Sequence, residues 1–309
     1  MNQAPTPTTD TVRRLVRSLL ADAPAAGTGP DVRPVTEGTA HSTWWVGTRH
    51  VLRLAPDREA SARQRRELRL RDLVRPHVAV ALPVSVAHGD WATGLGYTLD
   101  TRLAGATSEE QDVSAVGEAD LAALLTGLRE VPVRQAEALG VPRAAPRSLE
   151  ELWTQAGRAA EQLAAADEFD PARLAQLTTP AAVQLAGQPG AAVLVHHGLE
   201  GGHLLVSADG RVRGVLGWTD AVIGDPTEDI AGLATAVGAP AAVRAATLAG
   251  YGARPCLRGL WLSRCDTVIR LADRLQGQGS DSVALLRTRL RRAWEAILLE
   301  RVTELTGDD

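Results

Sequence analysis

The stretch of sequence that decides the fold lies between residues 193 and 229. It begins Val193-Leu194-Val195-His196-His197-Gly198-Leu199-Glu200-Gly201-Gly202-His203-Leu204-Leu205-Val206 and continues, after a turn, as Gly214-Val215-Leu216-Gly217-Trp218-Thr219-Asp220-Ala221. It ends Ile223-Gly224-Asp225-Pro226-Thr227-Glu228-Asp229. Short apolar runs at 191–195, 204–206 and 212–216 are typical of strands, and Ala208-Asp209-Gly210 favours a hairpin turn. Because small β units of this kind present loops, we expect the chemistry in this island, residues 191–229.

The rest of the chain divides into a β-rich first part and a helical second part. The first part predicts a helix at 12–21, a loop at 23–34, strands at 42–46 and 50–54, an amphipathic helix at 58–73, and strands at 78–87 and 95–103. The second part predicts helices at 119–129, at 148–166 and over most of the sequence beyond 240. We therefore expect an α+β protein with a β-rich lobe, residues 1–103, and a helical lobe, residues 104–309, that holds the island.

Composition excludes several classes of protein. The chain has 309 residues, 45% of them apolar, and a formal net charge of −4. A near-neutral chain without a basic face gives no sign of nucleic-acid binding. No run reaches the roughly 18 to 20 apolar residues of a membrane span, and the polar first residues lack the apolar core of a signal peptide. We therefore expect a cytoplasmic protein with neither a nucleic-acid nor a membrane partner.

Two residue types limit the chemistry further. All 33 basic residues are arginine, so any mechanism that needs a lysine amine is excluded. The two cysteines, Cys256 and Cys265, form neither a disulfide framework nor a zinc pattern, and we expect ordinary buried thiols.

The island resembles the core of the aminoglycoside and macrolide phosphotransferases, small-molecule kinases with the bilobal protein-kinase fold. In that family a strand is followed by H-G-D-L-H-P-G-N, whose last letter can be H, and then by a hairpin, G-x-I-D-W and G-D-P-x-x-D. Residues 196–203, 214–218 and 224–229 follow this pattern in order and spacing. His203 and residues 218–221 look more like the macrolide branch.

The resemblance extends over most of the chain and implies where a nucleotide, ATP or GTP, would bind. Residues 50–54 resemble the strand that follows the nucleotide loop, with Arg53 as the phosphate-facing cation. Glu67 stands where the lobe-bridging helix of the family carries the glutamate partner of that cation. Thr101 and Leu103 lie in a stretch that looks like the hinge between the lobes and are candidate cofactor contacts. The nucleotide loop would lie at 36–42, where a single glycine gives little support.

The departures from the family pattern fall on the catalytic positions. Phosphoryl transfer needs one carboxylate that accepts the proton of the substrate hydroxyl and a second that holds magnesium against the phosphates. The resemblance places Gly198 at the first position and Gly217 at the second. Glycine can perform neither task, so we expect phosphoryl transfer to be lost and to return with Gly198→Asp and Gly217→Asp together. His203 keeps a metal-ligand position, but one imidazole is a poor magnesium site, because Mg²⁺ prefers oxygen ligands.

Loss of the metal also affects the cofactor. Because magnesium neutralises much of the triphosphate charge, we expect ATP or GTP binding to be weakened and the magnesium site to be degraded.

Other polar residues of the island have two interpretations each. Glu200 either swings toward the cleft as a substitute base or faces solvent, and His196 is either a catalytic neighbour or a loop-packing residue. Asp220 fills an acidic position that the macrolide branch already has, and it either keeps its local role there or replaces the ligand lost at Gly217. The resemblance implies that Asp225 and Asp229 cap the following helix and brace the catalytic loop, with a catalytic role as the alternative.

Three functions follow from these residues. The first is a small-molecule pseudokinase that acts by binding. The second is an active transferase for a hydroxylated antibiotic or natural product that uses Glu200 and His203. The third is a product without function. The resemblance implies that predicted helices at 148–166, 240–251 and 257–276 wall the acceptor pocket. If they do, their Leu, Ala and Val favour a bulky, partly apolar, macrolide-like ligand over a polycationic one; the alternative is that these side chains are ordinary core.

Overall fold

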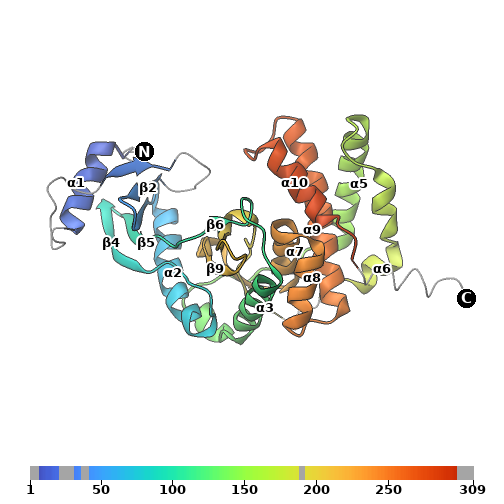
Figure 1. Cartoon of the computed structure of the whole chain (residues 1–309), viewed down its shortest axis with the longest axis horizontal. Coiled ribbons are helices and arrows are strands. Elements are labelled where there is room, and N and C mark those ends of the chain that lie inside the picture. The colour runs from blue at the N-terminus through green and yellow to red at the C-terminus, as the bar shows by residue number, and fades with distance from the viewer. Residues whose placement is uncertain (1–6, 21–30, 36–41, 188–191, 298–309) are drawn as a thin grey trace, which may run out of the picture.

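The computed structural model describes residues 7–20, 31–35, 42–187 and 192–297. Its N-terminal part is an antiparallel five-stranded sheet in the order β1-β2-β3-β5-β4 (Figure 1). The strands are β1 (Val32–Pro34), β2 (Ser42–Val46), β3 (His50–Leu54), β4 (Ser85–Ala92) and β5 (Leu95–Thr101). Helices α1 (Thr9–Leu19) and α2 (Arg58–Val74) pack against the sheet.

The two faces of this sheet differ in polarity, because side chains alternate along each strand. Leu52 and Leu99 are paired across β3 and β5 and share a buried apolar cluster with Val16 of α1. Arg53 and Asp100 alternate to the opposite face, where their side chains meet those of α2. The sheet therefore has an apolar core on one face and a buried polar layer on the other.

The island lies between this sheet and the helices (Figure 1). Strands β6 (Ala106–Thr107), β8 (Leu204–Val206) and β9 (Val212–Val215) form one antiparallel sheet in the order β6-β8-β9. Strands β7 (Val193–Val195) and β10 (Val222–Gly224) pair antiparallel and bring the two ends of the island together. Two short 3₁₀ turns, η4 (Gly201–His203) and η5 (Trp218–Asp220), lie within it.

Helices make up most of the remainder. They are α3 (Ala115–Glu130), α4 (Val133–Ala138), α5 (Leu149–Ala165), α6 (Thr179–Gln184), α7 (Thr227–Val237), α8 (Ala239–Leu248), α9 (Ala253–Leu275) and α10 (Val283–Ala293), with 3₁₀ turns η1 (Arg75–His77) and η2 (Pro171–Gln176). One apolar core joins α2, α3, α7 and α8 to the island, and a second joins α5, α9 and α10. Figure 1 shows α5 and α10 at the end of the molecule opposite to α1. No helix of the described residues is long and apolar enough to cross a membrane.

Most predicted elements are confirmed, and two are wrong. The predicted strand at 78–87 is shifted: β4 begins only at Ser85, and the segment before it carries an isolated bridge from Ala81 to Gly214. Pro83 has no N–H for a ladder, and Arg75 donates to the carbonyl oxygens of Leu82 and Pro83 instead. The predicted loop at 23–34 ends in β1, which its Pro-rich composition concealed, while residues 23–30 of that loop lie outside the described residues. Residues 36–41 of the expected nucleotide loop and residue 191 lie outside the described residues.

Candidate functional site

The island brings four of the predicted site residues together around one imidazole. Nδ1 of His203 lies 2.6 Å from the carbonyl oxygen of Gly198, so Nδ1 carries the proton and donates it. A Cβ added to Gly198 would lie 3.5 Å from the same nitrogen and 3.7 Å from Nδ1 of His196. A Cβ added to Gly217 would lie 2.6 Å from Nε2 of His203. The His203 ring therefore lies between the backbones of the two glycines.

The backbone at Gly217 is left-handed, with φ 81° and ψ 36°. Glycine adopts this conformation without cost, and Asp or Asn tolerates it better than other residues. The left-handed turn carries the chain from β9 into η5, where Trp218 is buried and its Nε1 donates to the carbonyl oxygen of Val215.

The carboxylate of Asp229, at the start of α7, braces the loop that follows β7. Its two oxygens each accept a backbone N–H, from His196 and from His197, both at 2.9 Å. His197 has a positive φ of 63° at this sharp bend. Burial raises the pKa of Asp229 to about 7, against the opposite effect of the two N–H groups. Asp225 accepts the N–H of Thr227, the first residue of the same helix, at 3.0 Å, while the N-cap position itself is Pro226.

His196 is completely buried under this brace. Its Nε2 lies 2.8 Å from the carbonyl oxygen of Leu216, and its ring meets Trp218 edge-on at 4.6 Å. Burial, together with the charge of His203, lowers the pKa of His196 to about 3. Nδ1 has no hydrogen-bond partner within the described part of the chain. His196 is therefore neutral, and the free lone pair of its Nδ1 lies near Gly198.

Glu200 is paired with two arginines. Its carboxylate oxygens lie 2.7 Å from Arg270 and 2.8 Å from Arg289, and Arg289 also contacts Glu109 and Asp281. Burial alone would raise the pKa of Glu200, but the two arginines outweigh burial and hold the pKa below its ordinary value. A carboxylate engaged in this way is a weak base.

Arg53 and Glu67 form the ion pair that the sequence predicted. The Arg53 nitrogens Nη1 and Nη2 donate to the two oxygens of Glu67 at 3.0 and 2.9 Å. Asp100 adds a second carboxylate 3.1 Å from Arg53, and Arg71 pairs with Asp100 at 3.1 Å. Burial tends to raise the pKa of Glu67, but Arg53 and Arg71 outweigh it and lower that pKa to about 2.

Sequence reasoning missed Asp100 and Arg71. The only signal for Asp100 was a charged residue inside a mostly apolar strand, two positions after Thr98 and so on the same face of the strand.

Thr219 links this ion-pair group to the island. Its hydroxyl donates to Glu67 at 2.7 Å, and Arg66 donates to its carbonyl oxygen. The segment after Gly217 is thereby held against α2. Of the two predicted hinge contacts, Thr101 exchanges hydrogen bonds with Val84 at the end of β5, and Leu103 packs against Gly214 of β9.

The donor set around the glycines does not fit magnesium. Across residues 7–20, 31–35, 42–187 and 192–297, no group of three or more His, Cys, Asp or Glu could hold a metal ion. Mg²⁺ requires an octahedral shell of oxygen atoms, while the side chains nearest to Gly198 and Gly217 are imidazoles.

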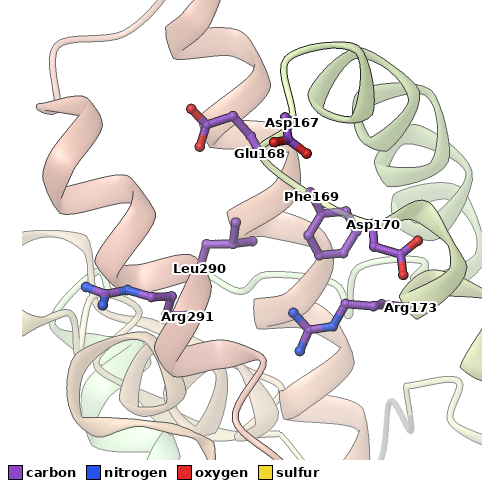
Figure 2. A pocket seen from close by; sticks show the side chains of 7 residues that line it. All are labelled: Asp167, Glu168, Phe169, Asp170, Arg173, Leu290 and Arg291. Atoms are coloured by element: carbon purple, nitrogen blue, oxygen red, sulfur yellow. The ribbon is translucent and has the colours of Figure 1, made fainter.

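A cavity of about 340 Å³ lies away from this site. Figure 2 shows it between residues 167–170 and 173 on one side and Leu290 and Arg291 of α10 on the other. None of its lining residues belongs to the island, and Arg173 donates to the carbonyl oxygen of Trp294 there. The cavity is therefore separate from the glycine and imidazole site.

A sheet joined through a β island to a helical part, with an arginine–glutamate pair beneath the sheet, defines a kinase-like bilobal fold. A family model described as "Phosphotransferase enzyme family" matches residues 31–260. The chain belongs to this family, which confirms the predicted fold class.

Solved structures with this fold include aminoglycoside and macrolide phosphotransferases. The GDP complex of aminoglycoside 2'-phosphotransferase-IIIa is 18% identical with a TM-score of 0.66, over 93% of this chain and 98% of that chain. The macrolide 2'-phosphotransferase of Brachybacterium faecium is 21% identical with a TM-score of 0.59, over 92% and 98% of the two chains. A macrolide 2'-phosphotransferase type I is 18% identical with a TM-score of 0.59, over 93% and 98%. A search of curated proteins finds no match.

Proposed function

We propose that this protein is a small-molecule pseudokinase: it binds a ligand in the cleft beside the island and does not transfer a phosphoryl group. The observation that carries the proposal is the surroundings of Gly198 and Gly217, where His203 lies between two residues without side chains. Phosphoryl transfer needs carboxylates at the reacting hydroxyl and at the metal. Imidazoles and backbone carbonyl groups replace neither of them, so both tasks go unperformed.

Arg53 and Glu67 serve as the nucleotide-facing pair in this proposal, with Thr101 and Leu103 at the hinge near the lobe boundary at residue 103. Related phosphotransferases have been solved with GDP and with ATP, which supports a nucleotide as one ligand. Without a fitting magnesium site, the triphosphate charge lacks its usual counter-ion, and binding is weak. The protein acts in the cytoplasm, without a nucleic-acid or membrane partner.

The second ligand is a hydroxylated small molecule of the macrolide kind. Related structures are macrolide phosphotransferases, or hold kanamycin or gentamicin. The apolar side chains of α5 and α9 pack in a buried core, so the preference for a macrolide-like compound rests on the related macrolide phosphotransferases. An active transferase that uses Glu200 as its base would require this carboxylate to leave Arg270 and Arg289. These contacts therefore favour the pseudokinase over the active transferase.

Two measurements test the proposal together. The first follows ADP formation from ATP and magnesium with a panel of macrolides and with kanamycin, and we expect no turnover above the protein-free background. The second follows the melting temperature with the same compounds, because a ligand that binds only the folded form raises it. Turnover in the first assay would refute the proposal. A melting temperature unchanged by every compound would indicate a product without function.

A further inference from the structure

Four charged side chains form a closed ring between the sheet and α2. Arg53 donates both terminal nitrogens to Glu67 and also contacts Asp100, while Arg71 contacts Asp100 at 3.1 Å and Glu67 at 3.8 Å. The ring holds two cations and two anions, so its formal charge is zero. Glu67, Asp100 and Arg71 are buried, and Arg53, with 17% of its side chain accessible, is the member that reaches the surface.

The register between β3 and β5 places Asp100 in this ring. Val51 pairs with Asp100 and Arg53 pairs with Thr98, so Arg53, Thr98 and Asp100 share the face that α2 covers. Thr98 donates its hydroxyl proton to Asp100 at 3.2 Å. Asp100 therefore accepts from three donors, two arginines and one hydroxyl, and its position is fixed.

The ring decides what Arg53 offers to a ligand. An anion that approaches from the surface meets Arg53 first. The carboxylates of Glu67 and Asp100 lie about 3 Å from Arg53, and they cancel the attraction that its charge would exert on the anion. Glu67 and Arg71 cancel each other in the same way. A neutral ring gives no net attraction to a phosphate chain, and desolvating it for a polyanion costs free energy.

We propose that Asp100 is a specificity-determining residue that makes the site facing Arg53 favour uncharged ligands, such as a nucleoside, over a nucleoside triphosphate. This inference rests on the proposed function, because it takes Arg53 as the group that faces the nucleotide. It adds that the protein binds the nucleoside part of the ligand and gains no affinity from the phosphates.

The test compares ATP with adenosine by calorimetry on the full chain, in EDTA so that no metal contributes. The wild type binds ATP no more tightly than adenosine. Asp100→Asn keeps the shape of the side chain and raises the ring charge to +1, and it tightens ATP binding about tenfold while adenosine binding stays the same. Glu67→Gln raises the ring charge by the same unit at another position and shifts the ratio of the two affinities in the same direction.

Two controls separate ring charge from other effects. The double variant Arg71→Gln with Asp100→Asn restores a neutral ring and returns the ratio to that of the wild type. Asp90 of β4 forms an exposed ion pair with Arg65 of α2. Asp90→Asn adds the same charge to the protein and leaves the ratio of the ATP and adenosine affinities unchanged. The ratio is insensitive to the folded fraction, because both ligands titrate the same sample.

Several results would overturn the inference. A wild type that binds ATP more than tenfold tighter than adenosine contradicts it, even if no variant folds. A ratio that neither Asp100→Asn nor Glu67→Gln changes also contradicts it. Binding of a macrolide without either adenosine or ATP refutes this inference and leaves the small-molecule pseudokinase standing, whereas binding of none of these compounds refutes both.

Discussion

The imidazole of His203 fills the space into which a side chain at Gly217 would project. A Cβ on Gly217 would lie 2.6 Å from Nε2, while Nδ1 of the same ring lies 2.6 Å from the carbonyl oxygen of Gly198. Unbonded heavy atoms at 2.6 Å overlap, so any side chain at 217 requires the ring to move. The ring is anchored at Gly198, and residues 198, 203 and 217 therefore form one structural unit.

This unit predicts what restores phosphoryl transfer. The sequence alone suggests that Gly198→Asp with Gly217→Asp is sufficient, but His203 blocks the second aspartate. We expect the double variant to remain inactive and the triple variant with His203→Asn to form ADP from ATP in a magnesium-dependent way. Asp tolerates the left-handed backbone at 217, and Asn leaves the space that the ring occupied. The matched control is Gly198→Asp with His203→Asn, which lacks the metal ligand. Higher activity in the double variant than in the triple would show that the ring moves freely.

A second prediction concerns the brace at Asp229. Asp229→Asn replaces one acceptor oxygen by an NH₂ group that faces the N–H of His196 or His197. Leaving one buried N–H without an acceptor costs about 1 to 3 kcal/mol, and we expect the free energy of unfolding in urea to fall by this amount. Asp220→Asn is the control, since Asp220 is exposed in the same island, and its change stays within about 0.5 kcal/mol. Equal effects of the two substitutions would mean that the brace carries no stability.

The sequence predicted those site features that depend on neighbouring residues or on a motif. The island shows in the strand-like runs and turn of its own residues, whereas the pairing of Arg53 with Glu67 and the bracing role of Asp229 were implied by the resemblance of their motifs to the family. The strand at 78–87 failed because Val80 and Leu82 alternate as in a strand but belong to the central core, and Pro83 interrupts the ladder.

Asp100 and Arg71 could not be predicted in the same way. The helix 58–73 carries many charges, and only the register between β3 and β5 determines which of them meets a carboxylate. The position of the His203 ring depends on the bend at His197 and the left-handed turn at Gly217, two local conformations that composition does not encode.

A third prediction follows from the buried His196. The folded state keeps this imidazole neutral, with its pKa lowered to about 3, while the unfolded chain takes up a proton near pH 6.5. Stability is therefore fully present above pH 6.5 and is lost as the pH falls, by about 2 to 3 kcal/mol between pH 6.5 and pH 4.5. His196→Gln keeps a donor for Leu216 and lacks this loss.

The readout is the difference between the two unfolding curves as a function of pH. Asp229, whose raised pKa makes stability fall as the pH rises toward 7, has the opposite sign and is present in both proteins, so it cancels. Parallel curves between pH 4.5 and pH 7 would show that His196 takes up a proton in the folded state as readily as in the unfolded chain.

The last prediction separates a structural Glu200 from a catalytic one. Arg270 is half exposed, so its pair with Glu200 is worth no more than about 1 kcal/mol, and Arg289 keeps Glu109 and Asp281 when Glu200 is removed. We expect Glu200→Ala to lower the free energy of unfolding by about 1 kcal/mol. A double-mutant cycle with Arg270→Ala should give a coupling below about 1 kcal/mol. The proposed function predicts that ADP formation stays at background in all of these proteins. If the wild type turns over ATP and Glu200→Ala abolishes that turnover while Arg270→Ala increases it, Glu200 is the base and the arginines restrain it.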